Sequence, residues 1–183
     1  MSGPRTLIAA LALALAVGLA PMPGQGQSTA IEGASGGSAL FMAGWTVDLG
    51  APEQRDGGLY LAPPAEGRTS YYIAPPSFTG SLSDKVALVF EKKSWGGTYY
   101  RDGDTWRGDV VIYGGSMVAA YTIAEDHSGE WRRYVIPLAD TGWTLSGRTP
   151  SLKQILSNVT RIEIRAEYGA GDDFSILRNV ELR

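Results

Sequence analysis

The chain contains no cysteine and only one histidine, His127, among its 183 residues. The absence of cysteine excludes disulfide bonds and cysteine nucleophiles, so stability must come from a hydrophobic core. A single histidine excludes histidine-rich metal sites. His127 lies in the polar segment AEDHSGEW, and we expect it to be a solvated loop residue without a catalytic role.

Clusters of basic residues are also missing. The chain has 16 Lys and Arg residues against 19 Asp and Glu residues. Arg5 is the one charged residue of the first 30, so without them 15 basic residues remain against 19 acidic ones, a net charge of −4. A mildly acidic chain of this kind argues against nucleic acid as a partner.

Long apolar runs are absent except for one near the N-terminus. Leu7–Leu19 is a run of 13 residues, which suits the apolar core of a signal peptide and is too short to span a bilayer. We expect residues 1–30 to be a signal peptide, with an uncleaved anchor as the alternative. After cleavage no membrane span would remain, and the protein would be secreted, to the extracellular space or the periplasm.

Residues 31–39 resemble a flexible leader, which leaves residues 40–183 as one domain. Short strand patterns alternate there with turn signals, and the 24 glycines are enough to supply a turn between every pair. The predicted strands are 59–62, 70–73, 85–91, 109–113, 117–123, 131–137, 159–168 and 174–182. This pattern predicts an all-β sandwich or barrel. Strands 85–91 and 109–113 are apolar on both faces and are therefore expected to be central.

The C-terminal part of the chain changes its period. Apolar residues at helical spacing predict a short helix over 150–158, with Thr149 as N-cap and Pro150 as its first residue. From Val159 the period is two, so that Ile162 and Ile164 should face the core. The charged residues between them, with Arg165 and Glu167, would then lie on an outward, solvated face.

Six segments, taken in order, resemble the laminin domain IV family, also called laminin B or laminin IV type A. They are YYIAPPSFTGSLSD, KVALVFE, DVVIYGG, EWRRYVIPLADTGW, RTPSLKQILSNVTRIEIRAEYGAGDD and RNVEL. The resemblance covers roughly residues 40–182. It implies a jelly-roll-like antiparallel β-sandwich (galactose-binding-like) with one short helix near the C-terminus. It also implies a non-catalytic extracellular module, of a kind that secreted bacterial proteins carry as well.

The resemblance has two departures. The segment SLSDK replaces the family's glycine-rich turn, and Arg178 replaces the aspartate of the terminal "DNV". Related jelly rolls often use such a carboxylate in a structural calcium site, so the cation at Arg178 removes the expectation of that site. We therefore expect no metal and no cofactor.

Candidate catalytic groups are few. Glu163 and Glu167 would suit a glycosidase pair, but four residues along a strand separate their Cα atoms by about 13 Å. We expect a charge ladder there and no catalytic residue. Asp102 and Asp104 are too few for a calcium loop. The tripeptide at residues 107–109, Arg-Gly-Asp, is more simply explained as coincidence, because Asp109 opens a strand.

The segment 92–108, KKSWGGTYYRDGDTWRG, is the most informative one for binding. Aromatic faces stack on sugar rings, and neighbouring charged groups donate or accept directed hydrogen bonds. The predicted ligand-binding residues are Trp95, Tyr99, Tyr100, Asp102 and Trp106, with Arg165 and Glu167 from the outward sheet face. The alternative is a long hairpin whose aromatics cover a sheet edge.

Three functions follow from these observations. The first is a secreted, non-enzymatic adhesion module that binds carbohydrate or a cell-envelope glycan. The second is a structural envelope or matrix protein that binds another extracellular protein. The third, a glycan-active hydrolase, would need a carboxylate pair facing a cleft.

Overall fold

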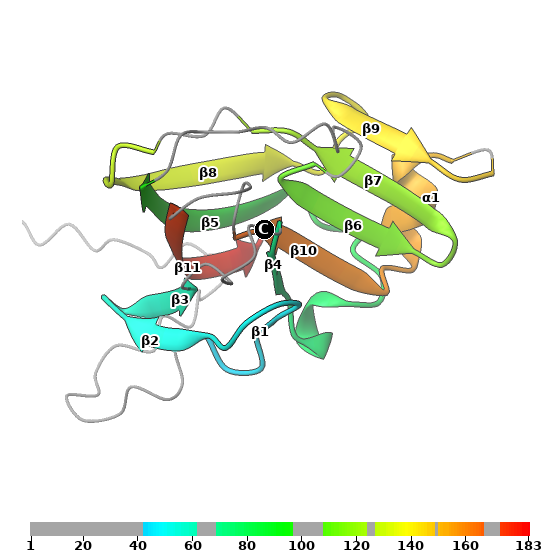
Figure 1. Cartoon of the computed structure of the whole chain (residues 1–183). Coiled ribbons are helices and arrows are strands. Elements are labelled where there is room, and N and C mark those ends of the chain that lie inside the picture. Colours follow the sequence, from blue (N-terminus) through cyan, green and yellow to red (C-terminus); the bar gives the residue numbers. More distant parts are fainter. Residues whose placement is uncertain (1–41, 62–68, 97–107, 124–126, 149, 167–172) are drawn as a thin grey trace, which may run out of the picture. The chain divides into compact units, whose positions relative to one another are not determined.

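Two antiparallel β-sheets enclose a shared hydrophobic core in the computed structural model of the protein (Figure 1). The structure describes residues 42–61, 69–96, 108–123, 127–148, 150–166 and 173–183. Every strand pairing among them is antiparallel. The predicted all-β sandwich with one short α-helix is therefore confirmed.

The larger sheet has six strands in the spatial order β1-β4-β10-β6-β7-β9. Their bounds are β1 Thr46–Val47, β4 Tyr71–Ile73, β10 Arg161–Arg165, β6 Val110–Gly114, β7 Met117–Tyr121 and β9 Trp143–Ser146. A 3₁₀ turn, η1 Pro76–Phe78, follows β4.

The smaller sheet has five strands in the order β2-β3-β11-β5-β8. Their bounds are β2 Glu53–Arg55, β3 Gly58–Leu61, β11 Asp173–Leu182, β5 Ala87–Gly96 and β8 Trp131–Pro137. Both β5 and β6 have strand neighbours on two sides, as predicted from their sequences, which are apolar on both faces.

The core lies between the inner faces of the two sheets, where alternate residues of each strand meet. The larger sheet contributes Tyr72, Val110, Ile112, Ala119, Ile162 and Ile164, and the smaller one Leu59, Leu61, Leu88, Phe90, Ile136 and Leu177. All are at most 7% exposed. The predicted inward direction of Ile162 and Ile164 is thus confirmed.

Four connections cross between the sheets at one end of the sandwich: β3 to β4, β5 to β6, β7 to β8, and β10 to β11. The Ser175 hydroxyl, near the start of β11, donates a hydrogen bond of 2.6 Å to the Ala166 carbonyl just beyond β10. The Tyr72 hydroxyl on β4 lies 2.8 Å from the same hydroxyl. These bonds join the two sheets at the end of the sandwich where β10 ends and β11 begins.

The predicted helix is present as α1, Leu152–Ser157, and it packs near the far end of β6 (Figure 1). Its buried residues are Leu152, Ile155 and Leu156. A Cβ atom at Gly114 would lie 2.8 Å from the Ile155 Cα atom, so only glycine allows this close approach.

The N-cap prediction at Thr149 is wrong. Ser151 is the N-cap, and its hydroxyl accepts a hydrogen bond of 3.2 Å from the Gln154 amide. The Ser151 hydroxyl also donates to the Gln154 side chain at 3.0 Å. The sequence SLKQ carries this Ser-x-x-Gln signature of a capping box.

The sequence prediction missed three short strands, β1, β2 and β9, and ended β5 too early. β2 is exposed throughout and β9 alternates between exposed and half-buried residues, so their own sequences carry little apolar signal. Pairing with neighbours makes them strands. β5 continues to Gly96 because β11 pairs with it as far as Asp173.

Candidate binding face

Two of the seven predicted ligand-binding residues, Trp95 and Arg165, fall within the described residues. Tyr99, Tyr100, Asp102, Trp106 and Glu167 lie outside them. The part of the prediction that rests on those five residues stays a prediction.

Trp95 lies in strand β5 and not in a loop, which corrects the sequence interpretation. It is directly opposite Phe174 of β11, and both side chains are half-buried. Leu88 and Phe90 of the same strand belong to the core. By the period of two, Trp95 therefore lies on the outer face of the five-stranded sheet.

Three aromatic rings from three neighbouring strands form a platform on this outer face: Tyr60, Trp95 and Phe174. Their centroids are 6.1 Å (Tyr60 to Trp95), 6.3 Å (Tyr60 to Phe174) and 5.5 Å (Trp95 to Phe174) apart. Their planes are within 18°, 8° and 15° of parallel. The three centroids therefore form a triangle and not a column, and the nearly parallel rings are offset from one another.

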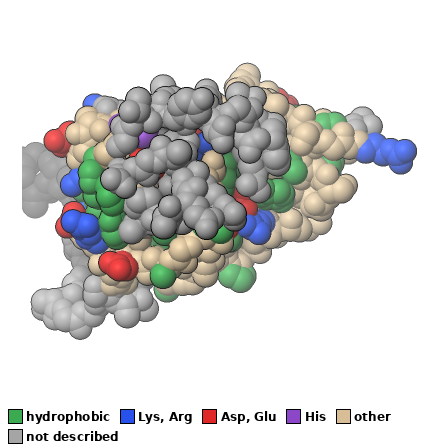
Figure 2. Space-filling view, in the orientation of Figure 1, with side chains coloured by type: hydrophobic (Ala, Val, Ile, Leu, Met, Phe, Trp, Pro, Cys, Tyr) green, Lys and Arg blue, Asp and Glu red, His purple; other side chains and the backbone are tan. Residues whose placement is uncertain are grey.

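Two cations lie over this aromatic platform. The Arg55 guanidinium carbon is 4.8 Å from the Tyr60 centroid and 6.0 Å from that of Trp95. The Lys93 ammonium is 5.5 Å from the Trp95 centroid. In the space-filling view, hydrophobic side chains with Lys or Arg beside them gather at the left, where β5 ends and β11 begins (Figure 2).

The β2–β3 hairpin holds Arg55 beside the aromatic platform. Its turn residues Asp56 and Gly57 both have positive φ, 51° and 74°, as a two-residue type I′ turn requires. Arg55 is directly opposite Gly58, where a Cβ atom would lie 2.6 Å from both the Ile176 side chain and the Leu177 carbonyl. The glycine therefore allows β3 to lie close against β11.

Sequence reasoning missed Tyr60, Phe174 and Arg55 as members of this surface. The signal was the alternation in GLYL: with Leu59 and Leu61 inward, Tyr60 must point outward. The strand order that brings these residues beside Trp95 has no signal in a single sequence.

The predicted solvated position of Arg165 is wrong. Arg165 is 4% exposed, and its Nε lies 3.4 Å from the Asp109 carboxylate. Its guanidinium carbon is 5.4 Å from the Tyr71 ring centroid. The Asp109 carboxylate also accepts a hydrogen bond of 2.7 Å from the Ile123 amide. Asp109 is 2% exposed, so it is fixed by the fold, as the coincidence interpretation of the Arg-Gly-Asp tripeptide required.

Glu163, expected on a solvated face, is also buried, at 2% exposed. Its carboxylate accepts a hydrogen bond of 2.9 Å from the Tyr113 hydroxyl and forms an ion pair with Arg161. The charges that lie between the inward apolar residues of β10 thus pair across the outer face of the larger sheet.

A buried polar cluster lies between the sheets at the loop end. It contains Lys92, Ser94, Asp173 and Ser175, none more than 8% exposed. Burial raises the pKa of Asp173 above its usual value, while its own backbone hydrogen bond and the charges of His127 and Lys92 act in the opposite direction. Both ring nitrogens of His127 are buried, so its expected solvated environment is wrong.

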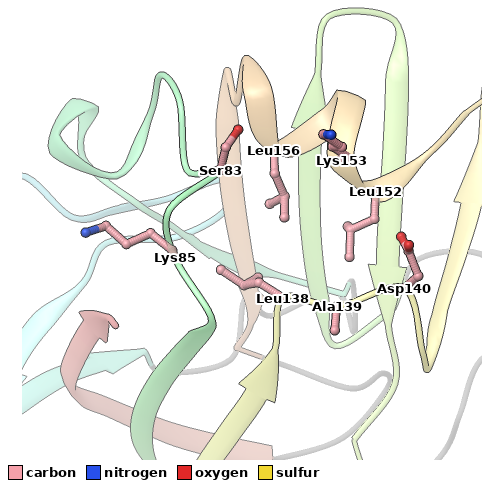
Figure 3. A pocket seen from close by; sticks show the side chains of 8 residues that line it. All are labelled: Ser83, Lys85, Leu138, Ala139, Asp140, Leu152, Lys153 and Leu156. Carbon is pink, nitrogen blue, oxygen red and sulfur yellow. The ribbon is translucent and has the colours of Figure 1, made fainter.

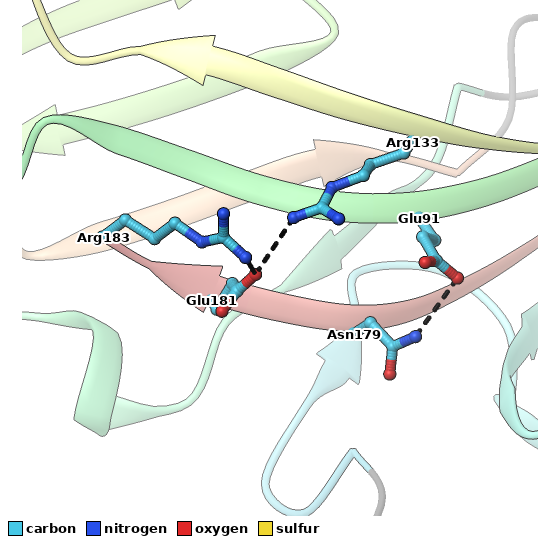
Figure 4. A network of polar contacts seen from close by, with 5 residues as sticks. All are labelled: Glu91, Arg133, Asn179, Glu181 and Arg183. Atoms are coloured by element: carbon cyan, nitrogen blue, oxygen red, sulfur yellow. Dashed lines mark hydrogen bonds and ion pairs between the residues drawn. The ribbon is translucent and has the colours of Figure 1, made fainter. Parts of the chain in front are cut away.

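Arg178, the residue that removed the expectation of a calcium site, has a carboxylate and an aromatic partner. Its Nε donates to Glu91 at 2.7 Å, and its guanidinium carbon lies 3.7 Å from the Trp131 centroid. Asn179 donates to the same carboxylate at 3.1 Å, and Glu181 pairs with Arg133 and Arg183 nearby (Figure 4). The described ranges contain no group of three or more His, Cys, Asp or Glu suited to a metal.

A small hollow of about 190 Å³ lies beside α1 at the other end of the sandwich. The side chains of Leu138, Leu152 and Leu156 point toward one another there, and Lys85 points away (Figure 3). Ser83, Asp140 and Lys153 also line the hollow, but its volume is below the roughly 300 Å³ at which ligand pockets begin. The aromatic platform is therefore the better binding candidate.

Comparisons with known proteins place this geometry in context. Residues 71–183 match the model of a family described as laminin B (domain IV). The L4b domain of human laminin alpha-2 is similar in structure, with a TM-score of 0.52 and 18% identity, over 63% of this chain and 69% of that chain. At that identity the likeness shows the fold. A search of curated proteins found no match.

No helix within the described ranges is both long and apolar enough to cross a membrane.

Proposed function

Because the chain belongs to the laminin B (domain IV) family, whose domains are structural, non-enzymatic extracellular modules, we propose that it is a secreted adhesion module that binds a glycan. The glycan would belong to the cell envelope or the surrounding matrix. Residues 1–30 would direct secretion, and the domain of residues 40–183 would bind.

The aromatic platform of Tyr60, Trp95 and Phe174 carries this proposal. The rings of Trp95 and Phe174, parallel to within 15°, offer apolar surface to a sugar ring, while the neighbouring Tyr60 is itself buried, at 7% exposed. Trp95 and Phe174 are half-buried, so each keeps part of its surface in solvent. The rigid strands beneath hold the rings in place without a ligand, which lowers the entropic cost of binding.

Binding to another extracellular protein is the competing function. Aromatic residues with arginine at their edge are also typical of protein interface hot spots. The platform is compatible with a glycan or a protein as its partner, so the test must include both kinds of ligand.

A paired substitution tests the proposal. Trp95→Ala removes the largest ring of the aromatic platform, and Trp143→Ala removes another half-buried tryptophan, on β9 of the other sheet. Each should lower the free energy of unfolding, by about 1–3 kcal/mol for a half-buried aromatic ring. Only Trp95→Ala should weaken glycan binding, by at least about tenfold.

The measurement is a titration of the secreted protein against a panel of envelope and matrix polysaccharides, with denaturant unfolding of both variants. Equal weakening by the two substitutions would show a general loss of structure and place the site elsewhere. A protein that binds none of the polysaccharides but retains an extracellular protein through Trp95 would instead have the competing function.

A further inference from the structure

Arg55 is an arginine without an ion pair among the described residues. Its contacts there are those with the rings of Tyr60 and Trp95. Other arginines of the described sheets have carboxylate partners: Arg133, Arg161, Arg165, Arg178 and Arg183. Arg55 is also exposed, so its charge is directed to solvent.

The stacking of Arg55 leaves its hydrogen-bonding edge open. A guanidinium over an aromatic ring uses its flat face for the cation–π contact, while its five N–H donors point outward in the plane. That planar fork matches two oxygens of a carboxylate or a sulfate. Because Tyr60 holds the guanidinium in place, an incoming anion meets a partly ordered donor.

Lys93 adds a second positive charge at the same platform. Its ammonium lies over Trp95, and its ion pair with Asp56 is long, at 3.9 Å, with side chains 28% and 56% exposed. Such an exposed pair contributes little, so an anion bound near Trp95 can compete with Asp56 for the lysine. Arg55 and Lys93 both lie within 6.0 Å of the Trp95 centroid.

We infer that the platform binds an anionic glycan, one whose sugar rings carry carboxylate or sulfate groups. The sugar ring contacts Trp95 and Phe174, while Arg55 donates a forked pair of hydrogen bonds to the acidic group and Lys93 adds a charge contact. This inference rests on the proposed function, since it names the class of glycan that the same site takes.

The test compares four polymers against the secreted protein by titration calorimetry. Polygalacturonate carries carboxylates, dextran sulfate carries sulfates, dextran is neutral, and polyglutamate carries carboxylates without sugar rings. We expect one of the acidic polysaccharides to bind at least about tenfold more tightly than dextran and polyglutamate, with an affinity that falls between about 0.05 and 0.5 M salt. Whichever of the two binds more tightly identifies the acidic group.

Matched substitutions distinguish forked hydrogen bonding by the Arg55 guanidinium from the effect of positive charge alone. Arg55→Gln should weaken binding to the acidic polysaccharide at least about tenfold, and Arg55→Lys should restore only part of the loss because an ammonium lacks the fork. Arg148→Gln is the control, because Arg148 is an exposed arginine beyond β9 of the other sheet. It removes the same charge and should leave the affinity unchanged.

Each contrary result has a distinct meaning. If dextran binds as tightly as the acidic polymers, and does so through Trp95, glycan binding stands and the anionic class is wrong. The class is equally wrong if Arg55→Gln and Arg148→Gln behave alike, or if polyglutamate binds as tightly as the acidic polysaccharides. If no polysaccharide binds, the proposed function fails together with this inference.

Discussion

At the scale of single residues, burial and ion pairing separate the charged residues that stabilise the fold from those that are available for binding. Glu163 and Arg165 are buried and held by Arg161 and Asp109, respectively. A buried charge costs several kcal/mol unless it is paired. Arg55, by contrast, lies exposed on aromatic rings, which is why we assign it to binding and the paired residues to structure.

Asp173 should make the stability of the protein depend on pH. Burial raises its pKa above the usual 3.8, so the folded state binds this proton more tightly than the unfolded state. Stability from this group is therefore lost as the pH rises above 3.8 through the raised value. Relative to Asp173→Asn, the wild-type protein should lose free energy of unfolding over that range.

Urea unfolding of both proteins at a series of pH values measures this difference. A difference that grows in favour of the wild type with rising pH would mean that Lys92 and His127 outweigh the cost of burial.

Asn179 should be sensitive to backbone conformation. Its φ is 53°, and it lies in the register shift of β11 between Arg178 and Glu181. Glycine adopts such a φ freely, whereas alanine is strained by about 1–2 kcal/mol. We expect Asn179→Ala to melt at a lower temperature than Asn179→Gly, although both lose the hydrogen bond to Glu91. The opposite order would show that backbone strain does not govern this position.

At the scale of elements, α1 is a short helix that depends on docking. Six residues are too few for an isolated helix in water, so its three buried apolar side chains must hold it. Leu156 is 5% exposed. Leu156→Ala should lower the free energy of unfolding by about 2–5 kcal/mol.

The exposed Lys153 of the same helix is the control for this prediction. Lys153→Ala should change stability by less than about 0.5 kcal/mol. Equal, small effects of the two substitutions in denaturant unfolding would show that the helix contributes no packing.

Strands with an apolar face were predictable from the sequence. β8 occupies its predicted range, and β3, β4, β6, β7, β10 and β11 overlap theirs, because alternation reports the face that each strand buries. The prediction ended β5 too early because its inward positions after Glu91 are occupied by the polar residues Lys92 and Ser94. A strand with polar residues at its inward positions lacks the alternating hydrophobic pattern from which strands are predicted.

The candidate site was only partly predictable. Trp95 was identified by residue type, but its neighbours Tyr60 and Phe174 come from strands that are distant in the sequence. Arg165 was assigned to solvent because charged residues usually lie there. Its partner Asp109 is 56 positions away, and no local pattern reports such a pair.

At the scale of the whole molecule, the sandwich should be stable without calcium. Arg178 binds Glu91, and its guanidinium lies over the Trp131 ring. A ligand that binds only the folded state would raise the melting temperature. We expect the melting temperature to be the same with and without EDTA. A decrease in EDTA that calcium reverses would contradict this expectation.

The central claim is that the platform around Trp95 is the glycan-binding surface. The chain has five tryptophans, and each gives one indole N–H signal in a proton–nitrogen correlation spectrum. Titration of ¹⁵N-labelled protein with the tightest-binding polysaccharide should shift the Trp95 signal and leave those of Trp45 and Trp143 in place. Shifts confined to Trp45 or Trp143, or no indole shift at saturation, would contradict the claim.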